Sequence, residues 1–203
     1  MTIYFITFFA SICFFVLAAK FKTKNKKLFY IFSTLGVIVP CVLAALRDTT
    51  IGTDVKVYAE PWFYLAKNCS SFSIFMQTIN CSDTLYMLFI YYSGKYFENL
   101  STFFFLTQLL NIVPLVIALN KYDKKINVPI AMSFNLMRQS IALSFFLLGF
   151  VHLLNGKTKK YFIFLLIAFL FHSSAILGVF VYLIYKFSKS KLYLIYNTAF
   201  ITA

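Results

Sequence analysis

The sequence predicts an all-α, polytopic integral membrane protein: a helical bundle with short re-entrant or hairpin helices and one amphipathic helix outside the membrane. Of its 203 residues, 61% are hydrophobic and only 12% are charged, whereas soluble domains average about 25% charged residues. Five stretches contain no charged residue, namely 1–19, 28–46, 99–120, 139–156 and 161–185. Each approaches or exceeds the roughly 17–25 residues that a bilayer crossing needs. A soluble globular fold is therefore excluded.

The net charge of +13 reflects membrane topology rather than nucleic-acid binding. Fourteen of the nineteen basic residues form four clusters between the apolar stretches. These clusters are Lys20/Lys22/Lys24/Lys26/Lys27, Lys121/Lys124/Lys125, Lys157/Lys159/Lys160 and Lys186/Lys189/Lys191. Short loops rich in lysine lie on the cytoplasmic side of a membrane. We therefore expect the lipid bilayer, and no nucleic acid, as a partner.

The acidic residues indicate which segment lies on the extracytoplasmic side of the membrane. Residues 48–83 hold four of the six acids against two lysines, so this segment is predicted to be an extracytoplasmic loop. The chain then starts outside, crosses at 1–19, returns at 28–46 and crosses again at 99–120. The first stretch is not a signal peptide, because its lysines follow the apolar run instead of preceding it. The uncharged stretch 84–94 is too short to span and is predicted to be interfacial or re-entrant.

Two further stretches separate the remaining lysine clusters. If every cluster is cytoplasmic, the chain in each stretch must enter the bilayer from the cytoplasmic side, reach the outer side and come back. Short or hairpin helices are therefore expected at 126–137 and 161–185, with 139–156 as a membrane helix. Arg138 and His172 would then lie near the outer turns. The alternative for 161–185 is a single tilted helix, which satisfies the length requirement but violates the charge rule.

The outer segment contains a predicted turn and helix. Gly52-Thr53-Asp54 has turn and N-cap character. After it, Tyr58, Trp62 and Leu65 recur at the spacing of one helical face. Tyrosine and tryptophan are typical of the membrane–water boundary. We therefore expect an outer amphipathic helix that lies on the bilayer.

Two arginines are the main candidates for chemistry, because neither belongs to a lysine cluster. An arginine near the hydrocarbon is costly and usually paired or functional, and its planar guanidinium suits bidentate binding of phosphate. The structural alternative for Arg47 is a side chain that snorkels from a helix end. For Arg138, the alternative is an ion pair with Asp48 or Asp54.

The histidines differ in their surroundings. His172 lies in a run with no other ionisable group except tyrosines, which allows either a general base or a neutral imidazole bonded to a helix carbonyl. His152 lies near the third lysine cluster and is expected to be structural. Asp48, Asp54 and Glu60 are spaced by six residues, which matches no metal-ligand pattern, and no Gly-rich phosphate loop is present. We expect neither a metal nor a cofactor.

The order of these elements resembles a known family. In chain order, the elements that carry the resemblance are Leu46-Arg47-Asp48, Gly52-x-Asp54-x-x-x-Tyr58, Arg138-Gln139-x-x-Ala142, Lys159-Lys160-Tyr161-Phe162 and Phe171-His172-x-Ser174-Ala175. Over roughly residues 28–187, the chain resembles the EpsG family of Wzy-like polysaccharide polymerases.

The resemblance implies a multi-pass protein of the bacterial inner membrane. Such a protein links repeat units carried on undecaprenyl diphosphate into exopolysaccharide or capsule, beside other polysaccharide-assembly membrane proteins. Arg47 and Arg138 would stabilise the departing diphosphate, and His172, or Asp54 as the less favoured alternative, would accept the proton of the attacking hydroxyl. Asp48, Asp54, Tyr58 and Gln139 are the expected substrate-binding residues.

Two other functions fit the same residues. The arginines of a transporter or binding protein would hold a lipid-linked oligosaccharide without bond cleavage, and an inactive structural component of an export complex would need no chemistry. Residues 192–203 resemble a helix cut short, so we expect the chain to be incomplete at its C-terminus.

Overall fold

The computed structural model describes residues 2–52, 54–122 and 137–188. All regular structure in these residues is helical, which confirms the predicted all-α membrane fold. Four helices are long and apolar enough to cross a bilayer. They are α1 (Thr2–Phe21), α2 (Lys26–Leu46), α6 (Leu100–Tyr122) and α7 (Met137–Leu154).

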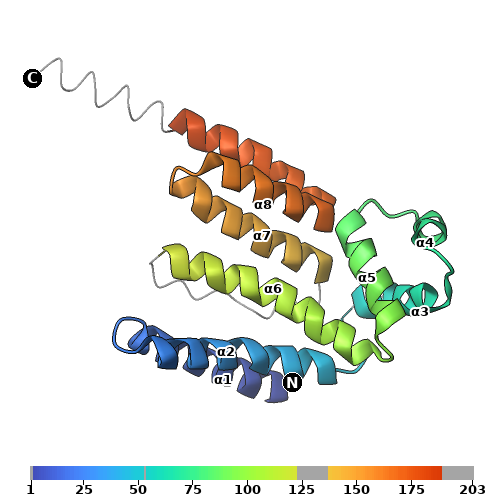
Figure 1. Ribbon diagram of the computed structural model, residues 1–203, viewed down its shortest axis with the longest axis horizontal. Helices are drawn as coiled ribbons and strands as arrows, with labels where there is room; N and C mark the ends of the chain where they lie inside the picture. Colours follow the sequence, from blue (N-terminus) through green and yellow to red (C-terminus); the bar gives the residue numbers. More distant parts are fainter. Residues whose placement is uncertain (1, 53, 123–136, 189–203) are drawn as a thin grey trace, which may run out of the picture.

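The shorter elements form two groups (Figure 1). At one end of the bundle lie the π-helical turn η1 (Val55–Ala59), α3 (Glu60–Asn68), α4 (Phe72–Ile79) and α5 (Thr84–Tyr96). We call this group the outer helices. Beside α7 lie α8 (Thr158–Phe171), the 3-10 turn η3 (Ser173–Leu177) and a helix over residues 178–188. The predicted segment 84–94 is therefore part of an outer helix.

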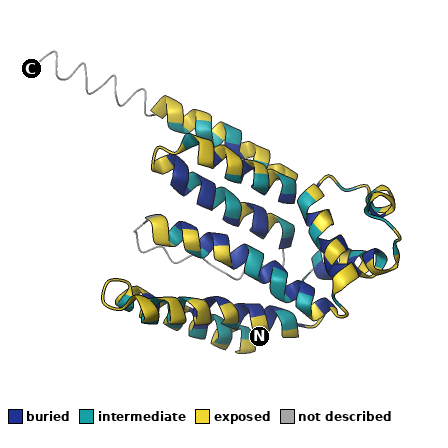
Figure 2. Cartoon of the chain, viewed as in Figure 1, coloured by how far each residue is buried: buried dark blue, intermediate teal, exposed yellow. Residues whose placement is uncertain are grey.

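Buried polar bonds join the long helices. The Ser11 hydroxyl of α1 donates to the Gly36 carbonyl of α2 at 2.6 Å, and Ser144 of α7 donates to Asn111 of α6 at 2.6 Å. Such bonds stabilise contacts between helices in lipid, where water cannot compete. In contrast, large apolar side chains along α1, such as Phe5 and Phe9, are exposed (Figure 2). Their exposure suits contact with lipid chains.

Helices α6 and α7 run in the same direction. Asn111 contacts Ser144 midway, and Lys121 contacts His152 farther on, so the paired residue numbers increase together. Both helices therefore begin at the end of the bundle where the outer helices lie. The short helix expected at 126–137 falls, except for Met137, outside the described residues, as do residues 192–203.

The lysine-rich turns lie at the other end of the bundle. The Lys22 ammonium, in the α1–α2 turn, donates to the Asn120 carbonyl near the end of α6 at 3.3 Å. Lys121 meets His152 at the adjacent end of α7, just before the turn that contains Lys157. The lysine-rich turns that contain Lys22, Lys121 and Lys157 thus lie at the end of the bundle opposite the acidic outer segment, as the charge-based orientation requires.

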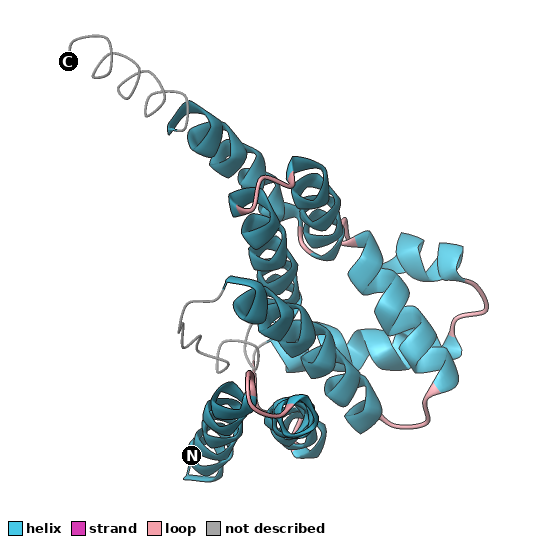
Figure 3. Ribbon diagram, turned by 60° about the vertical axis from the view of Figure 1, so that its left-hand side comes forward, coloured by secondary structure: helices cyan, strands magenta, loops and turns pink. Residues whose placement is uncertain are grey.

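The stretch 161–185 consists of two helical segments (Figure 3). Helix α8 ends at Phe171, and His172 is extended with φ −158° and ψ 125°. The chain then runs back along α8, because the Tyr161 hydroxyl bonds the Gly178 carbonyl and the Tyr161 and Tyr182 rings stack at 6.2 Å. His172 therefore lies in the break between two helical segments, and the stretch is not one continuous helix.

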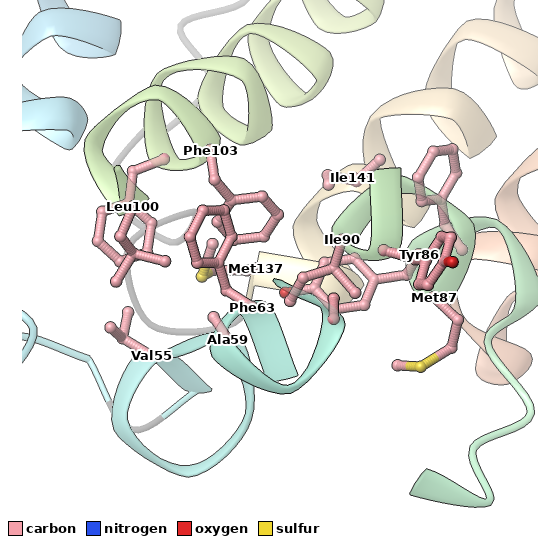
Figure 4. Packing of buried hydrophobic residues seen from close by; sticks show 14 of the residues in the cluster. Val55, Ala59, Phe63, Tyr86, Met87, Ile90, Leu100, Phe103, Met137 and Ile141 are labelled. Atoms are coloured by element: carbon pink, nitrogen blue, oxygen red, sulfur yellow. The ribbon is translucent and has the colours of Figure 1, made fainter. Parts of the chain in front are cut away.

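The outer helices share a core with the first turns of α6 and α7 (Figure 4). Phe63, Tyr86 and Phe103 come from α3, α5 and α6 and are almost completely buried. Helices α3 and α5 approach closely at Gly94, where an added Cβ would lie 2.7 Å from the Phe63 carbonyl oxygen. This packing fixes the outer helices against the bundle.

The orientation is tested by cysteine accessibility. In a chain whose four native cysteines are replaced, we expect Lys56→Cys to react with an impermeant maleimide from the outer side. Lys159→Cys should react only after permeabilisation. The reverse pattern would overturn the orientation, because it follows entirely from the sign of the charge clusters.

The close approach of α3 and α5 predicts a second result. Gly94→Ala should lower the free energy of unfolding by about 1–3 kcal/mol, because the methyl group meets backbone that cannot move aside. Gly36→Ala is the matched control, since its nearest neighbour is the rotatable Phe15 ring at 3.0 Å. Thermal unfolding in detergent measures both. Equal stability of Gly94→Ala and the wild type would contradict the packing described.

Candidate functional site

A single carboxylate gathers the candidate residues. Asp83 Oδ2 accepts from Arg138 Nη1 at 3.1 Å and lies 3.2 Å from His172 Nδ1. Asp83 Oδ1 accepts from the Ser173 backbone N–H at 3.2 Å. The Asp83 side chain is only 4% exposed, so its charge is stable there only because these donors replace water. We call these four residues the Asp83 cluster.

Asp83 directly precedes α5, but its side chain bonds a different element. Asp83 occupies the N-cap position of α5, yet its side chain makes no capping bond to that helix. Instead, it satisfies the N–H of Ser173, the first residue of η3. Such an N–H has no partner within its own helix. The carboxylate therefore ties α5 to the break after α8.

Asp54 makes a similar contact across elements. It precedes η1 without capping it, and its Oδ2 accepts from the backbone N–H of Met137 at 3.1 Å. Met137 begins α7, so the carboxylate also meets the positive end of that helix dipole. Gly52 has φ 99°, which a residue with a side chain rarely adopts, and it turns the chain toward this contact. Burial raises the pKa of Asp54, while the nearby Arg138 guanidinium opposes that effect.

Aromatic rings enclose the Arg138 guanidinium. Its central carbon lies 4.5 Å from the centre of the Tyr58 ring, 5.4 Å from that of Trp62 and 5.9 Å from that of Tyr86. A cation over an aromatic face is stabilised by the ring quadrupole. Tyr58 and Trp62, which are both partly exposed, therefore contact the partly buried Arg138, and their expected contact with the bilayer stays a prediction.

The structural alternative for Arg138, an ion pair with Asp48 or Asp54, names the wrong carboxylate. The guanidinium bonds Asp83. Asp54 bonds Met137 N–H. The exposed Asp48 accepts from the Thr50 N–H and hydroxyl at 2.8 and 2.7 Å within its own turn, and these bonds lower the pKa of Asp48. Local turn bonds thus compete successfully for the carboxylate of Asp48.

Arg47 contacts Met137, the residue that directly precedes Arg138. Its Nη2 is 3.2 Å from Met137 Sδ, and its guanidinium carbon is 4.2 Å from the centre of the Phe104 ring. The residue is 8% exposed, so the snorkelling alternative is wrong. Burial lowers the pKa of Arg47 to about 10, which leaves it protonated at neutral pH. Arg47 thus contacts the first turn of α7, the turn that also contains Arg138.

His172 is oriented by Asp83 and partly open to solvent. Its side chain is 23% exposed. A carboxylate beside Nδ1 favours the tautomer that carries its proton on Nδ1, which leaves Nε2 as an acceptor. Gln139, by contrast, is exposed and lies in an apolar groove beside α7. The Asp83 cluster brings His172 and Arg138 together but includes neither Gln139 nor Asp48.

Comparison with known proteins identifies the family. The EpsG family model matches residues 30–203. The chain belongs to the EpsG family. No curated protein and no solved structure matches it. Family membership indicates a polysaccharide polymerase-like role, and the four candidate spans make this EpsG-family protein a multi-pass membrane protein.

Four site residues of this EpsG-family protein escaped the sequence-based selection. The sequence assigns Trp62 to the membrane–water boundary and singles out neither Tyr86 nor Met137, although each of the three contacts an arginine. Asp83 had one available signal, since an aspartate immediately before the apolar run 84–94 is a typical N-cap. That signal predicts the start of a helix. It does not predict that the carboxylate turns toward Arg138 and His172.

Metal binding gains no support from the described ranges. Within them, no group of three or more His, Cys, Asp or Glu side chains is arranged to hold a metal ion. The absence of a metal cofactor from this EpsG-family protein stays a prediction. The charges at the Asp83 cluster come instead from protein side chains.

Removal of the central carboxylate is expected to destabilise the protein. Asp83→Ala should lower the free energy of unfolding by about 3–5 kcal/mol, because it leaves the partly buried Arg138 without its counter-ion. Thermal unfolding in detergent measures this loss. In a double-mutant cycle, the loss should shrink when Arg138→Met is already present. Asp48→Ala, at an exposed aspartate, is the control with a much smaller expected effect. Independent, additive losses from Asp83→Ala and Arg138→Met would contradict the pairing.

Proposed function

We propose that this protein polymerises oligosaccharide repeat units linked to undecaprenyl diphosphate, at the outer face of the bacterial inner membrane. The supporting observation is the Asp83 carboxylate, which positions a guanidinium and an imidazole together at 3.1 and 3.2 Å. A cation that binds diphosphate and a base that accepts a proton are the two groups that glycosyl transfer from a lipid diphosphate requires.

The proposed reaction is a displacement at a sugar carbon. A hydroxyl oxygen of one repeat unit forms a bond to the anomeric carbon of another, and the bond from that carbon to the diphosphate oxygen breaks. The hydroxyl proton passes to His172 Nε2. The bonding pair leaves with the lipid diphosphate, whose negative charge increases as it departs.

Arg138 is proposed to stabilise the departing diphosphate directly. Asp83 and the rings of Tyr58 and Trp62 hold its guanidinium in place, so little reorganisation is needed during the reaction. Arg47, which contacts Met137, is proposed to add a second positive charge near Arg138. In a poorly solvated region, such a charge acts over a longer range than it would in water.

The remaining expected binding residues fall into two proposed roles. Tyr58 orients Arg138 through its ring, and Asp54 supports the same turn by its bond to Met137. Gln139 and Asp48, both exposed, are proposed to contact the glycan or its lipid carrier from the rim. Because polymerisation consumes lipid-linked repeat units, we also propose that other membrane proteins of polysaccharide assembly supply them.

Lysine replacements test the role of the arginines. In cells lacking their own polymerase, Arg138→Lys should reduce polymer formation by about 100-fold, because a point charge loses the bidentate geometry. Arg47→Lys should also reduce it, and the double variant should be as defective as alanine replacements. Lys159→Arg, at an exposed position of the lysine-rich end, is the control.

The result that would contradict the polymerase is full polymer length in the double lysine variant. Binding of lipid-linked oligosaccharide by the wild type without any new glycosidic bond would instead favour a transporter. Polymer length is read from gel profiles of extracted polysaccharide, and protein levels in the membrane are matched by immunoblotting.

A further inference from the structure

An apolar groove lies beside the Asp83 cluster. It is formed by α7, η3 and the helix at 178–188, and its volume of about 380 Å³ falls in the range typical of small-ligand sites. Its lining residues are Gln139, Ser140, Ala142, Leu143, Phe146, Ser174, Ala175, Leu177, Gly178 and Val181. We call it the α7 groove.

The polar lining residues all lie at one end of the α7 groove. Gln139 directly follows Arg138, and Ser174 directly follows Ser173, whose N–H bonds Asp83. Ser140 already donates its hydroxyl to the Met137 carbonyl at 2.9 Å. From Gln139 to Phe146, α7 rises by about 10 Å. The groove therefore starts beside the charged groups and continues along α7 with apolar walls.

The α7 groove is suited to a hydrocarbon rather than a sugar. A bound sugar needs several hydrogen-bonding partners, and a polar group left without a partner in an apolar site is costly. Beyond its polar end, this groove has only apolar side chains. An amphiphile with an anionic head and a hydrocarbon tail therefore matches the cluster and the groove together.

We propose that the α7 groove holds the first isoprenoid units of the lipid carrier, with the diphosphate at Arg138. This inference rests on the proposed function and adds where the carrier lies. Gly178 supports the groove wall, because an added Cβ there would collide with Leu165 of α8. The helix at 178–188 is thus held close to α8 at this wall of the groove.

A second apolar groove provides an internal comparison. It lies between α2 and α6, has a similar volume of about 410 Å³ and includes Leu109 and Val113. None of its lining residues belongs to, or directly adjoins, the Asp83 cluster. It offers a hydrocarbon the same kind of surface without a neighbouring guanidinium and imidazole. It therefore separates a specific carrier site from general lipid contact.

The test compares matched substitutions in the two grooves. The full chain in detergent is titrated with undecaprenyl diphosphate, and the bound lipid is counted by native mass spectrometry. Val181→Trp fills the α7 groove and should weaken binding by about tenfold, because the indole excludes the chain from apolar surface. Val113→Trp, in the second groove, should leave the affinity within about twofold. Leu143→Trp and Leu109→Trp repeat the comparison if Val181→Trp does not fold.

Further measurements distinguish a failure of the groove inference from a failure of the proposed function. Competition by inorganic diphosphate should be lost in Arg138→Lys and kept in Val181→Trp. Weakening of undecaprenyl diphosphate binding by Val181→Trp, without weakening of phosphatidylglycerol binding, supports the carrier as occupant. If Arg138→Lys abolishes binding while Val181→Trp and Leu143→Trp do not change it, the groove inference fails and the diphosphate site stands. If Val181→Trp alone weakens binding, the diphosphate role of Arg138 fails.

Three other results would overturn the inference. They are equal weakening by the two valine substitutions, equal loss of phosphatidylglycerol from the α7 groove, and a change of oligomeric state in Val181→Trp with lipid affinity unchanged. The last result would assign the groove to a second copy of the chain.

Discussion

The buried carboxylate of Asp83 is the interaction on which the outer end of the molecule depends. Three donors surround it, from the start of α7, from the break after α8 and from the backbone of η3. A carboxylate that is nearly inaccessible to water remains charged only when such donors are fixed around it. The same requirement that stabilises Asp83 therefore holds Arg138 and His172 at one place, and the site and the fold share one constraint.

Asp54 and Asp83 also show how the outer helices are joined to the membrane bundle. Each precedes a helix of the outer group, and each bonds a backbone N–H at the start of a helical element elsewhere, Met137 or Ser173. The usual N-cap closes its own helix. Here the carboxylates connect elements that are about 80–90 positions apart in sequence, so the outer core and the first turn of α7 form one unit.

The chemistry proposed for the protein follows from where this unit lies along the bundle. The ion pair of Arg138 and Asp83 lies where α7 begins, and exposed apolar side chains continue along the helices (Figure 2). A lipid diphosphate has the same division between an anionic head and a hydrocarbon tail. The Asp83 cluster and the α7 groove present both surfaces side by side, which is the physical reason for assigning the substrate and its carrier to this end of the bundle.

Composition and the order of charges along the chain alone determined the fold class and the four long helices, and they marked Arg138 and His172 as candidate site residues. Burial in lipid and the cost of an unpaired charge depend on residue type and on the length of local apolar runs, and both can be read from the sequence. The order of charges also indicated a break near His172, since lysine clusters flank both sides of that stretch. Only the tertiary structure decided the partners. Asp83, rather than Asp48 or Asp54, is the counter-ion of Arg138, and the rings of Tyr58 and Trp62 lie against the guanidinium. Those choices depend on which helix ends meet in space, and local patterns of residues do not specify contacts between segments so far apart in the chain.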